Sequence, residues 1–182
     1  MALTPSLDLP LGTLMPSFCL PDTAGNLVSL ERCEPAGAYL VMFICNHCPY
    51  VKHLAAPLSA LTREFAQREV QIFGIMSNDV TRYPADAPNL MKAEKETLGY
   101  VFPYLYDGQQ NVAKAYMAQC TPEFFVFDRL KHLFYHGQFD DTRPGGGAAH
   151  GEDLRSALEA TLEGKEAAIA QKPALGCGIK WR

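Results

Sequence analysis

The sequence predicts a single α/β domain, and its apolar pattern and composition both indicate this class. The apolar pattern of the 182 residues alternates between strand-like and helix-like periods, with no internal repeat. Hydrophobic residues make up 48% of the chain and charged residues 20%, which is typical of a globular protein with an ordinary core. At about 150 residues per domain, we expect one domain over residues 1–182.

The first half of the chain predicts a hairpin followed by a strand–helix–strand unit. Short apolar runs at residues 18–20 and 27–30 flank a turn rich in Pro, Asp, Gly and Asn, which predicts an N-terminal β-hairpin. Residues 38–44 are apolar on both faces, as a strand between two helical layers must be. Apolar positions three or four apart predict a helix over about 49–68, and residues 70–76 read as a second buried strand. This order predicts a parallel pair of strands.

The second half predicts two helices, a hairpin and an irregular end. A helix over 88–99 begins at a proline and closes at a glycine. Residues 123–127 and 132–135 form strands separated by a short polar turn, which is typical of a hairpin. Residues 151–164 predict a final amphipathic helix. Residues 165–182 show little periodicity, so we expect a C-terminal tail packed on the domain.

Charge and hydropathy exclude several classes of partner. The net charge of −4 offers no basic field for nucleic-acid phosphates or anionic lipid. The longest apolar run, residues 38–45, is too short to span a bilayer, and the N-terminus lacks the pattern of a signal peptide. We therefore expect a cytoplasmic protein that acts on a small molecule or a protein, without nucleic-acid or membrane partners.

The six cysteines direct attention to one pair. Their density is low for a disulfide-stapled secreted protein, and in a reducing compartment paired cysteines indicate redox or metal chemistry. Only Cys45 and Cys48 lie close together, between the predicted central strand and the following helix. Pro49 is typical of the first helical position, which makes Cys48 the expected N-cap. The positive end of a helix lowers a thiol pKa, so Cys48 is the candidate nucleophile.

The same spacing gives Cys45 a role. From three residues upstream, Cys45 can attack a mixed disulfide on Cys48 and release the partner. The pair would then cycle between dithiol and disulfide, as in a thiol–disulfide oxidoreductase that needs no organic cofactor. Its partners would be a disulfide substrate, protein or small molecule, and an external thiol reductant.

Several motifs resemble the thioredoxin-like redoxins. They are Pro16-x-Phe18-x-Leu20, a strand that runs into a cysteine pair, and Cys120-Thr121-Pro122 before another strand. More narrowly, Phe43-x-Cys45-Asn46-His47-Cys48-Pro49-Tyr50-Val51 resembles the branch of the alkyl hydroperoxide reductase/thiol-specific antioxidant (AhpC/TSA) group with the motif F-x-C-N-H-C-P-Y-V. The resemblance implies a thioredoxin-like fold: a central mixed β-sheet flanked by helices, with an N-terminal β-hairpin and an inserted helix.

The resemblance also implies a set of residues around the thiols. Thr121-Pro122 would be a cis-proline turn that packs beside the redox cysteines and pairs with the backbone of a bound peptide or thiol. Apart from the resemblance, Cys177 lies between two glycines in the tail, which leaves two interpretations: a structural or idle residue, or one mobile enough to resolve a disulfide. Strand ends at the same edge would bring in further polar residues, among them Arg143. The substrate-positioning candidates are Asn46, His47, Cys120, Thr121 and Pro122.

The choice of nucleophile has an alternative. In ordinary thioredoxins an aromatic residue lies five positions before the nucleophile, and here Phe43 lies five before Cys48. The arrangement C-x-H-C, however, also resembles the oxidising disulfide isomerases, and by that comparison Cys45 would attack first. Both assignments remain open at this stage.

Two other functions compete with disulfide exchange. Typical peroxiredoxins carry P-x-x-x-T-x-x-C, and Val41 and Cys45 occupy the proline and threonine positions here, so a peroxiredoxin-like thiol peroxidase is the first alternative. The second is a redoxin that binds zinc or copper through Cys45, Cys48 and His47, joined by Cys120 or His53. The principal interpretation includes no metal, and it treats Cys19 and Cys33 as inert buried residues.

Overall fold

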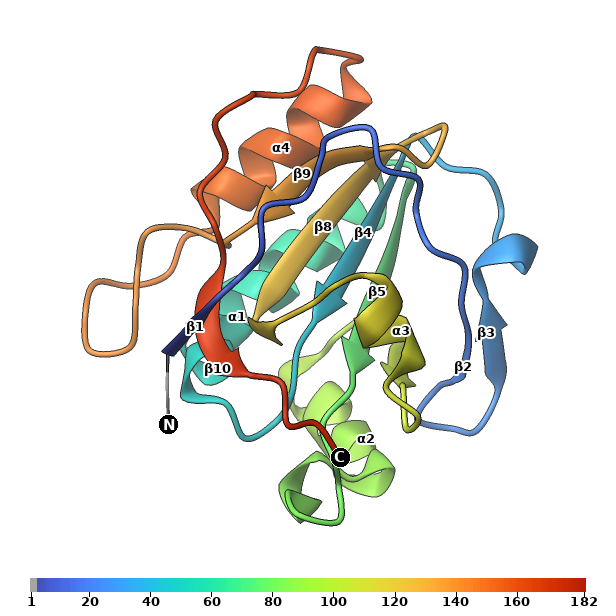
Figure 1. Cartoon of the computed structure of the whole chain (residues 1–182), viewed down its shortest axis with the longest axis vertical. Helices are drawn as coiled ribbons and strands as arrows, with labels where there is room; N and C mark the ends of the chain where they lie inside the picture. The colour runs from blue at the N-terminus through green and yellow to red at the C-terminus, as the bar shows by residue number, and fades with distance from the viewer. Residues whose placement is uncertain (1–2) are drawn as a thin grey trace.

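A five-stranded mixed sheet forms the centre of the computed structural model, which describes residues 3–182 (Figure 1). The predicted domain also included residues 1–2, which lie outside the described residues. The central strand β4 pairs in parallel with β5 and antiparallel with β8, so the predicted strand–helix–strand unit and second hairpin are both present. In spatial order the strands are β6 (Tyr104–Tyr106), β5 (Val70–Met76), β4 (Ala38–Phe43), β8 (Glu123–Asp128) and β9 (Leu133–Gly137).

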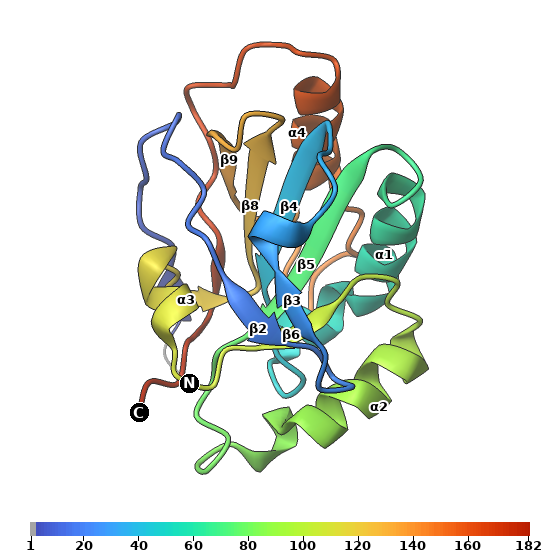
Figure 2. The same ribbon diagram turned by 90° about the vertical axis from the view of Figure 1, so that its right-hand side faces the viewer.

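Helices and loops cover both faces of this sheet, which explains why β4 is apolar throughout. Leu40 and Met42 face a core shared with the long helices, while Val41 and Phe43 face a second core on the opposite side. Figure 2 shows the sheet between these two layers. Within residues 3–182, no helix combines the length and apolarity needed to cross a membrane. One layer contains α1 (Pro49–Phe65), α2 (Pro88–Leu98) and α4 (Glu152–Leu162), and the other contains α3 (Asn111–Ala115) and the hairpin of β2 (Cys19–Pro21) and β3 (Leu27–Ser29).

The structure adds short elements that the sequence pattern did not predict. They are too short to show a period of two or of 3.6 residues, so their conformation depends on tertiary contacts. They comprise β1 (Leu3–Pro5), the 3₁₀ turns η1 (Leu30–Arg32) and η2 (Pro84–Asp86), β6, α3, β7 (Cys120–Thr121) and β10 (Leu175–Gly178).

The C-terminal residues differ most from expectation, because they contain a strand with fixed partners. Strand β10 lies between β1 and β7 in a small antiparallel sheet, with Cys177 opposite Thr121 (Figure 1). A Cβ atom at Gly176 would overlap the carbonyl group of Thr121, so only glycine allows this close approach. Beyond the strand, the Lys180 N–H donates to Asn78 Oδ1 at 2.8 Å. Cys177 is therefore held in place, and the interpretation that it is mobile is wrong.

Candidate active site

The cysteine pair lies in the loop between β4 and α1, at the carboxyl ends of the parallel strands. Cys45 follows β4 in the connecting loop, and Cys48 is the N-cap of α1 with Pro49 at the first helical position, as predicted. The peptide bond between Thr121 and Pro122 is cis, as the resemblance implied. Strand β7 ends at Thr121, which brings this turn against the two cysteines.

Thr121 contacts both sulfur atoms of the pair. Cys45 Sγ lies 3.3 Å from Thr121 Oγ1, and Cys48 Sγ lies 3.2 Å from the Thr121 carbonyl oxygen. Cys177 lies opposite Thr121 on β10 and belongs to the same buried cluster as Cys48. All six cysteines of the chain are free thiols in this structure. Cys48 therefore has two thiol neighbours, one from its own loop and one from the C-terminal strand.

Hydrogen bonds within this group of thiols shift the pKa values of Cys45 and Cys48 in opposite directions. The thiol of Cys45 donates to Cys48, and this is the largest of several effects that together lower the pKa of Cys48 from 9.0 to about 5, against the opposing effect of burial. Donation by Cys177 and the N–H group of Val51 in the first turn of α1 act in the same direction. The pKa of Cys45 rises well above 9.0, because its proton is held by Cys48 and because burial and the Asp86 carboxylate disfavour its thiolate. These effects favour the thiolate at Cys48 over the thiolate at Cys45.

Two other buried thiols, Cys177 and Cys120, stay protonated at neutral pH. Burial, and then donation to Cys48, raise the pKa of Cys177 to about 12. Burial and the Glu123 carboxylate raise the pKa of Cys120, which lies beside Thr121 as expected. Cys19 is exposed, so the expectation that it is buried is wrong.

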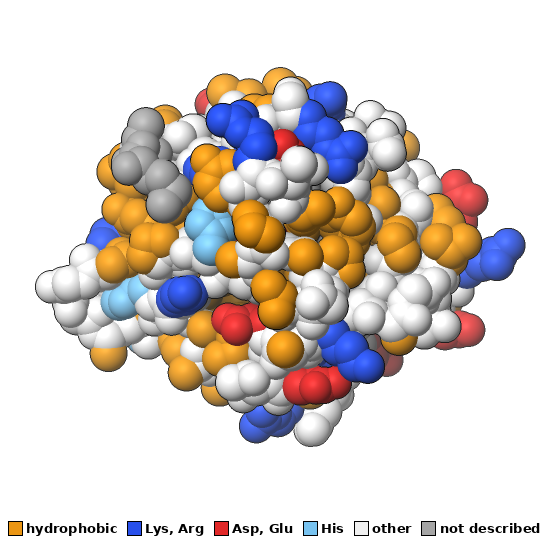
Figure 3. Space-filling model, turned by 90° about the horizontal axis from the view of Figure 1, so that it is seen from below, with side chains coloured by type: hydrophobic (Ala, Val, Ile, Leu, Met, Phe, Trp, Pro, Cys, Tyr) orange, Lys and Arg blue, Asp and Glu red, His pale blue; other side chains and the backbone are white. Residues whose placement is uncertain are grey.

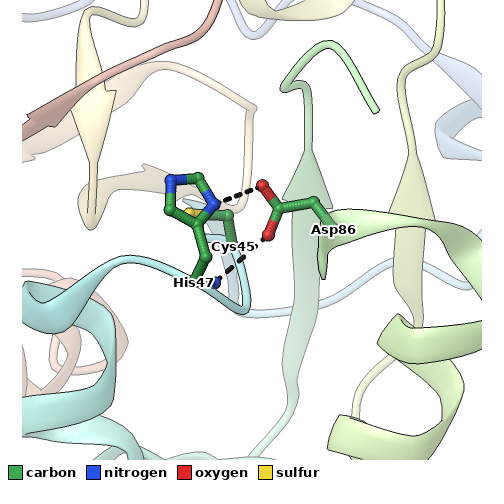
Figure 4. Close-up of side chains that lie close together, drawn as sticks. All are labelled: Cys45, His47 and Asp86. Carbon is green, nitrogen blue, oxygen red and sulfur yellow. Dashed lines mark hydrogen bonds and ion pairs between the residues drawn. The ribbon is translucent and has the colours of Figure 1, made fainter. Parts of the chain in front are cut away.

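The buried carboxylate of Asp86 fixes the loop that carries the cysteines (Figure 4). It accepts the backbone N–H groups of Asn46 at 2.9 Å and His47 at 3.2 Å, and it pairs with His47 Nδ1 at 2.6 Å. Asn78 Nδ2 donates to it at 2.9 Å. Burial raises the pKa of Asp86, but these hydrogen bonds outweigh burial and lower it overall. Sequence reasoning missed Asp86, because it lies 40 residues after Asn46 in a 3₁₀ turn that no motif marks.

Asn46 and His47 are engaged by the chain itself. The Asn46 amide donates to the Ala85 carbonyl at 3.0 Å and accepts from the Tyr104 hydroxyl at 3.0 Å. The His47 ring stacks on Tyr83 with centroids 5.2 Å apart, and its Nε2 is buried without a partner. Both residues that the sequence suggested as substrate-positioning therefore hold the loop in place in this state.

One group of side chains has the composition of a metal site. A ligand atom of each of Cys45, His47 and Asp86 lies within 4.8 Å of the others, and zinc accepts all three ligand types. Cys48 is not part of this group. His53, the other histidine suggested as a ligand, is engaged by Thr142 Oγ1 at 3.0 Å.

A rigid loop borders the cis-proline turn on the side of α1. Asp140 accepts hydrogen bonds from Thr142 and from the start of α4, and despite partial burial these bonds lower its pKa to about 2. Arg143 donates to Gln138 Oε1 and to the Thr142 carbonyl. Asp140 and Arg143 both line a small depression with Pro122, so Arg143 reaches the neighbourhood of the turn, but its guanidinium is bound by acceptors of its own loop.

The reduced site is closed to solvent. Cys48 is 0% exposed and Cys45 is 1% exposed. Figure 3 views the molecule from the end that holds the site, and apolar side chains occupy much of the middle of this face, with most charged side chains nearer its rim. A large reagent can therefore reach Cys48 only after part of the cover moves.

The model of the AhpC/TSA family matches residues 11–136, which is well over half of the chain. This chain belongs to the AhpC/TSA family. Membership places it among the thiol-dependent redox proteins, which are oxidoreductases, and confirms the resemblance seen in the sequence. No curated protein matches the chain.

Solved structures confirm the thioredoxin-like fold. An uncharacterized conserved protein from Geobacillus kaustophilus is 47% identical, with a TM-score of 0.96 over 100% of this chain and 97% of that one. Peroxidoxin BcpB from Mycobacterium tuberculosis is 20% identical, with a TM-score of 0.63 over 86% and 98%. A thiol:disulfide interchange protein of the thioredoxin family from Chlorobium tepidum TLS is 18% identical, with a TM-score of 0.64 over 86% and 99%. At these lower identities the likeness concerns the fold alone.

We expect the thiolate of Cys48 to be visible in a pH titration. In the reduced protein, ultraviolet absorbance of the thiolate should rise with a midpoint near pH 5, and Cys48→Ser should remove this transition. Cys45→Ala removes the strongest donor and should move the midpoint toward 9.0. Because the folded-state pKa is the lower one, Cys48 should add stability as pH rises from 5 to 9, and this contribution should be lost as pH falls back to 5. A wild-type midpoint near 9.0 would contradict this account.

Asp86→Asn should loosen the cysteine loop. Replacing the buried acceptor of several N–H groups should lower the free energy of unfolding by about 1–3 kcal/mol, measured with urea. It should also speed alkylation of Cys45 in the native protein, followed by mass spectrometry. Asp107→Asn is the matched control, because Asp107 is equally buried but binds Ser77 and Ala113. Equal alkylation of Cys45 in the two variants would show that Asp86 has no specific role in the loop.

Proposed function

We propose that this chain is a thiol–disulfide oxidoreductase in which Cys48 is the nucleophile and Cys45 resolves the mixed disulfide. The proposal rests on the position of Cys48 at a helix N-terminus beside a second thiol, with opposite pKa shifts for the two cysteines. Cys48 lies at the N-terminus of α1 with a lowered pKa, while the pKa of Cys45, three residues earlier in the same loop, is raised. A thiolate beside a thiol is the state that attacks a disulfide and then resolves the product.

The reaction proceeds in two exchanges. The Cys48 thiolate attacks one sulfur of a substrate disulfide, forms a mixed disulfide and releases the other half of the substrate as a thiolate. Cys48 then no longer accepts the proton of Cys45, so the main cause of the raised Cys45 pKa disappears. Cys45 gives its proton to the departing thiol and bonds to Cys48. The chain gains one disulfide, the substrate gains two electrons, and an external thiol reductant restores the dithiol.

The proposal extends to partners and location. The substrate is a disulfide of a protein or of a small molecule, and the reaction takes place in the cytoplasm without nucleic acid or membrane. Complete burial of Cys48 favours small disulfides, because a protein disulfide needs a larger opening.

The burial of Cys48 also supports a second candidate, reduction of peroxides. A peroxide is small enough to enter a closed site, where the Cys48 thiolate would attack one oxygen, release an alcohol or water and become a sulfenic acid. Cys45 would then displace water and form the same Cys45–Cys48 disulfide. The two candidates share every residue and differ in the oxidant.

Rapid mixing of the reduced protein with oxidised glutathione, and separately with hydrogen peroxide, tests the proposal. We expect fast exchange with the disulfide, slow reaction with peroxide, and loss of both in Cys48→Ser. The double variant Cys45→Ser/Cys177→Ser, which removes both thiols that contact Cys48, should retain one glutathione on Cys48 in mass spectra.

Two outcomes would overturn these assignments. The roles of the two residues would be reversed if Cys45 captured glutathione in the variant Cys48→Ser/Cys177→Ser. In that case Cys48 would carry no glutathione in Cys45→Ser/Cys177→Ser. Peroxide consumption far faster than that of a free thiol, through a sulfenic acid on Cys48, would make the chain a peroxidase.

A further inference from the structure

The C-terminal strand covers the backbone edge next to the nucleophile. An exposed strand edge is the usual place where an extended peptide adds to a sheet. Strand β7 ends at Thr121, and the edge to which a peptide could add is paired with β10 of the same chain. The residue of β10 that lies opposite Thr121 is Cys177, so this chain places one of its own thiols beside the reactive sulfur.

The packing that brings Cys177 to Cys48 is specific. The Thr121 carbonyl oxygen lies 3.2 Å from Cys48 Sγ. Strand β10 pairs with Thr121 through Cys177. Gly176 permits this approach because any side chain there would overlap the Thr121 backbone. Cys48 and Cys177 belong to the same buried core, and Cys177 lies opposite Thr121, whose carbonyl oxygen is 3.2 Å from Cys48 Sγ.

The charges near the two neighbours of Cys48 have opposite signs. The Asp86 carboxylate disfavours a thiolate at Cys45. The ammonium group of Lys180, which donates to the Gly178 carbonyl, favours a thiolate at Cys177. An attacking thiol must lose its proton, and the Lys180 ammonium group, 2.6 Å from the Gly178 carbonyl next to Cys177, stabilises the thiolate that forms there.

We propose that Cys177 is a second resolving residue, which attacks the Cys48 mixed disulfide and forms a Cys48–Cys177 disulfide in competition with Cys45. This inference rests on the function proposed above and adds a residue to it. In this step the Cys177 proton passes to the departing substrate thiol, a sulfur–sulfur bond forms between Cys177 and Cys48, and the bond from Cys48 to the substrate breaks. Attack by Cys45 on the new disulfide would then yield Cys45–Cys48 and return the Cys177 thiol.

The variant Cys45→Ser tests this proposal directly, with oxidised glutathione as the oxidant. We expect it to release both glutathione molecules and to form a Cys48–Cys177 cross-link, identified by peptide mapping. Cys45→Ser/Cys177→Ser should stop after release of the first glutathione. Cys45→Ser/Cys120→Ser is the matched control: Cys120 is also buried beside Thr121, but its sulfur faces the Pro122 carbonyl and Glu123, so the cross-link should persist.

The outcomes separate this inference from the proposed function. If Cys45→Ser accumulates glutathione on Cys48 while Cys177 stays free, the inference is wrong and the proposed function stands. If no variant that retains Cys48 ever binds glutathione there, both are wrong. Should Cys177→Ser unfold the chain, mapping of Cys45→Ser still decides, because that variant retains Cys177 and β10.

Discussion

Burial of a negatively charged sulfur is the constraint on which this site depends. An isolated anion in a protein interior is strongly destabilising unless donors surround it. Cys48 is completely buried, and its donors come from the adjacent loop, from the first turn of α1 and from β10. The loop and α1 are continuous with Cys48, but β10 is distant in sequence, so the full set of donors exists only when the C-terminal strand has assembled on the domain.

A second buried acidic group, Asp86, adds to the effects that disfavour a charge on Cys45. Its hydrogen bonds to the backbone of Asn46 and His47 fix the loop, and its charge opposes ionisation of Cys45. Cys45 therefore keeps its proton and donates it to Cys48, whose position at the helix N-terminus favours the anion. The roles proposed for the two cysteines rest on these different environments, although the residues lie only three positions apart.

The sequence predicted the parts of this arrangement that local chemistry determines. Pro49 marked the start of α1 and so identified Cys48 as the N-cap, and the uniformly apolar β4 indicated a central strand. It could not predict β10, where two glycines and a cysteine show no alternation and pairing depends on β1 and β7. Asp86 was missed for the same reason, because a carboxylate in a proline-containing turn has no local pattern that reveals its burial. Closure of the site is likewise a tertiary property.

The central claim is that Cys48 is a redox-active thiolate within a closed cluster of thiols. It is tested most directly by a redox titration of the wild-type protein in glutathione buffers over roughly −320 to −120 mV, the range spanned by cellular thiol pools and known redoxins. The account predicts a reversible two-electron transition in which one intramolecular disulfide forms and always includes Cys48, as shown by peptide mapping. If Cys48 remained a free thiol across this range, or if the disulfide joined other cysteines, the account would be contradicted.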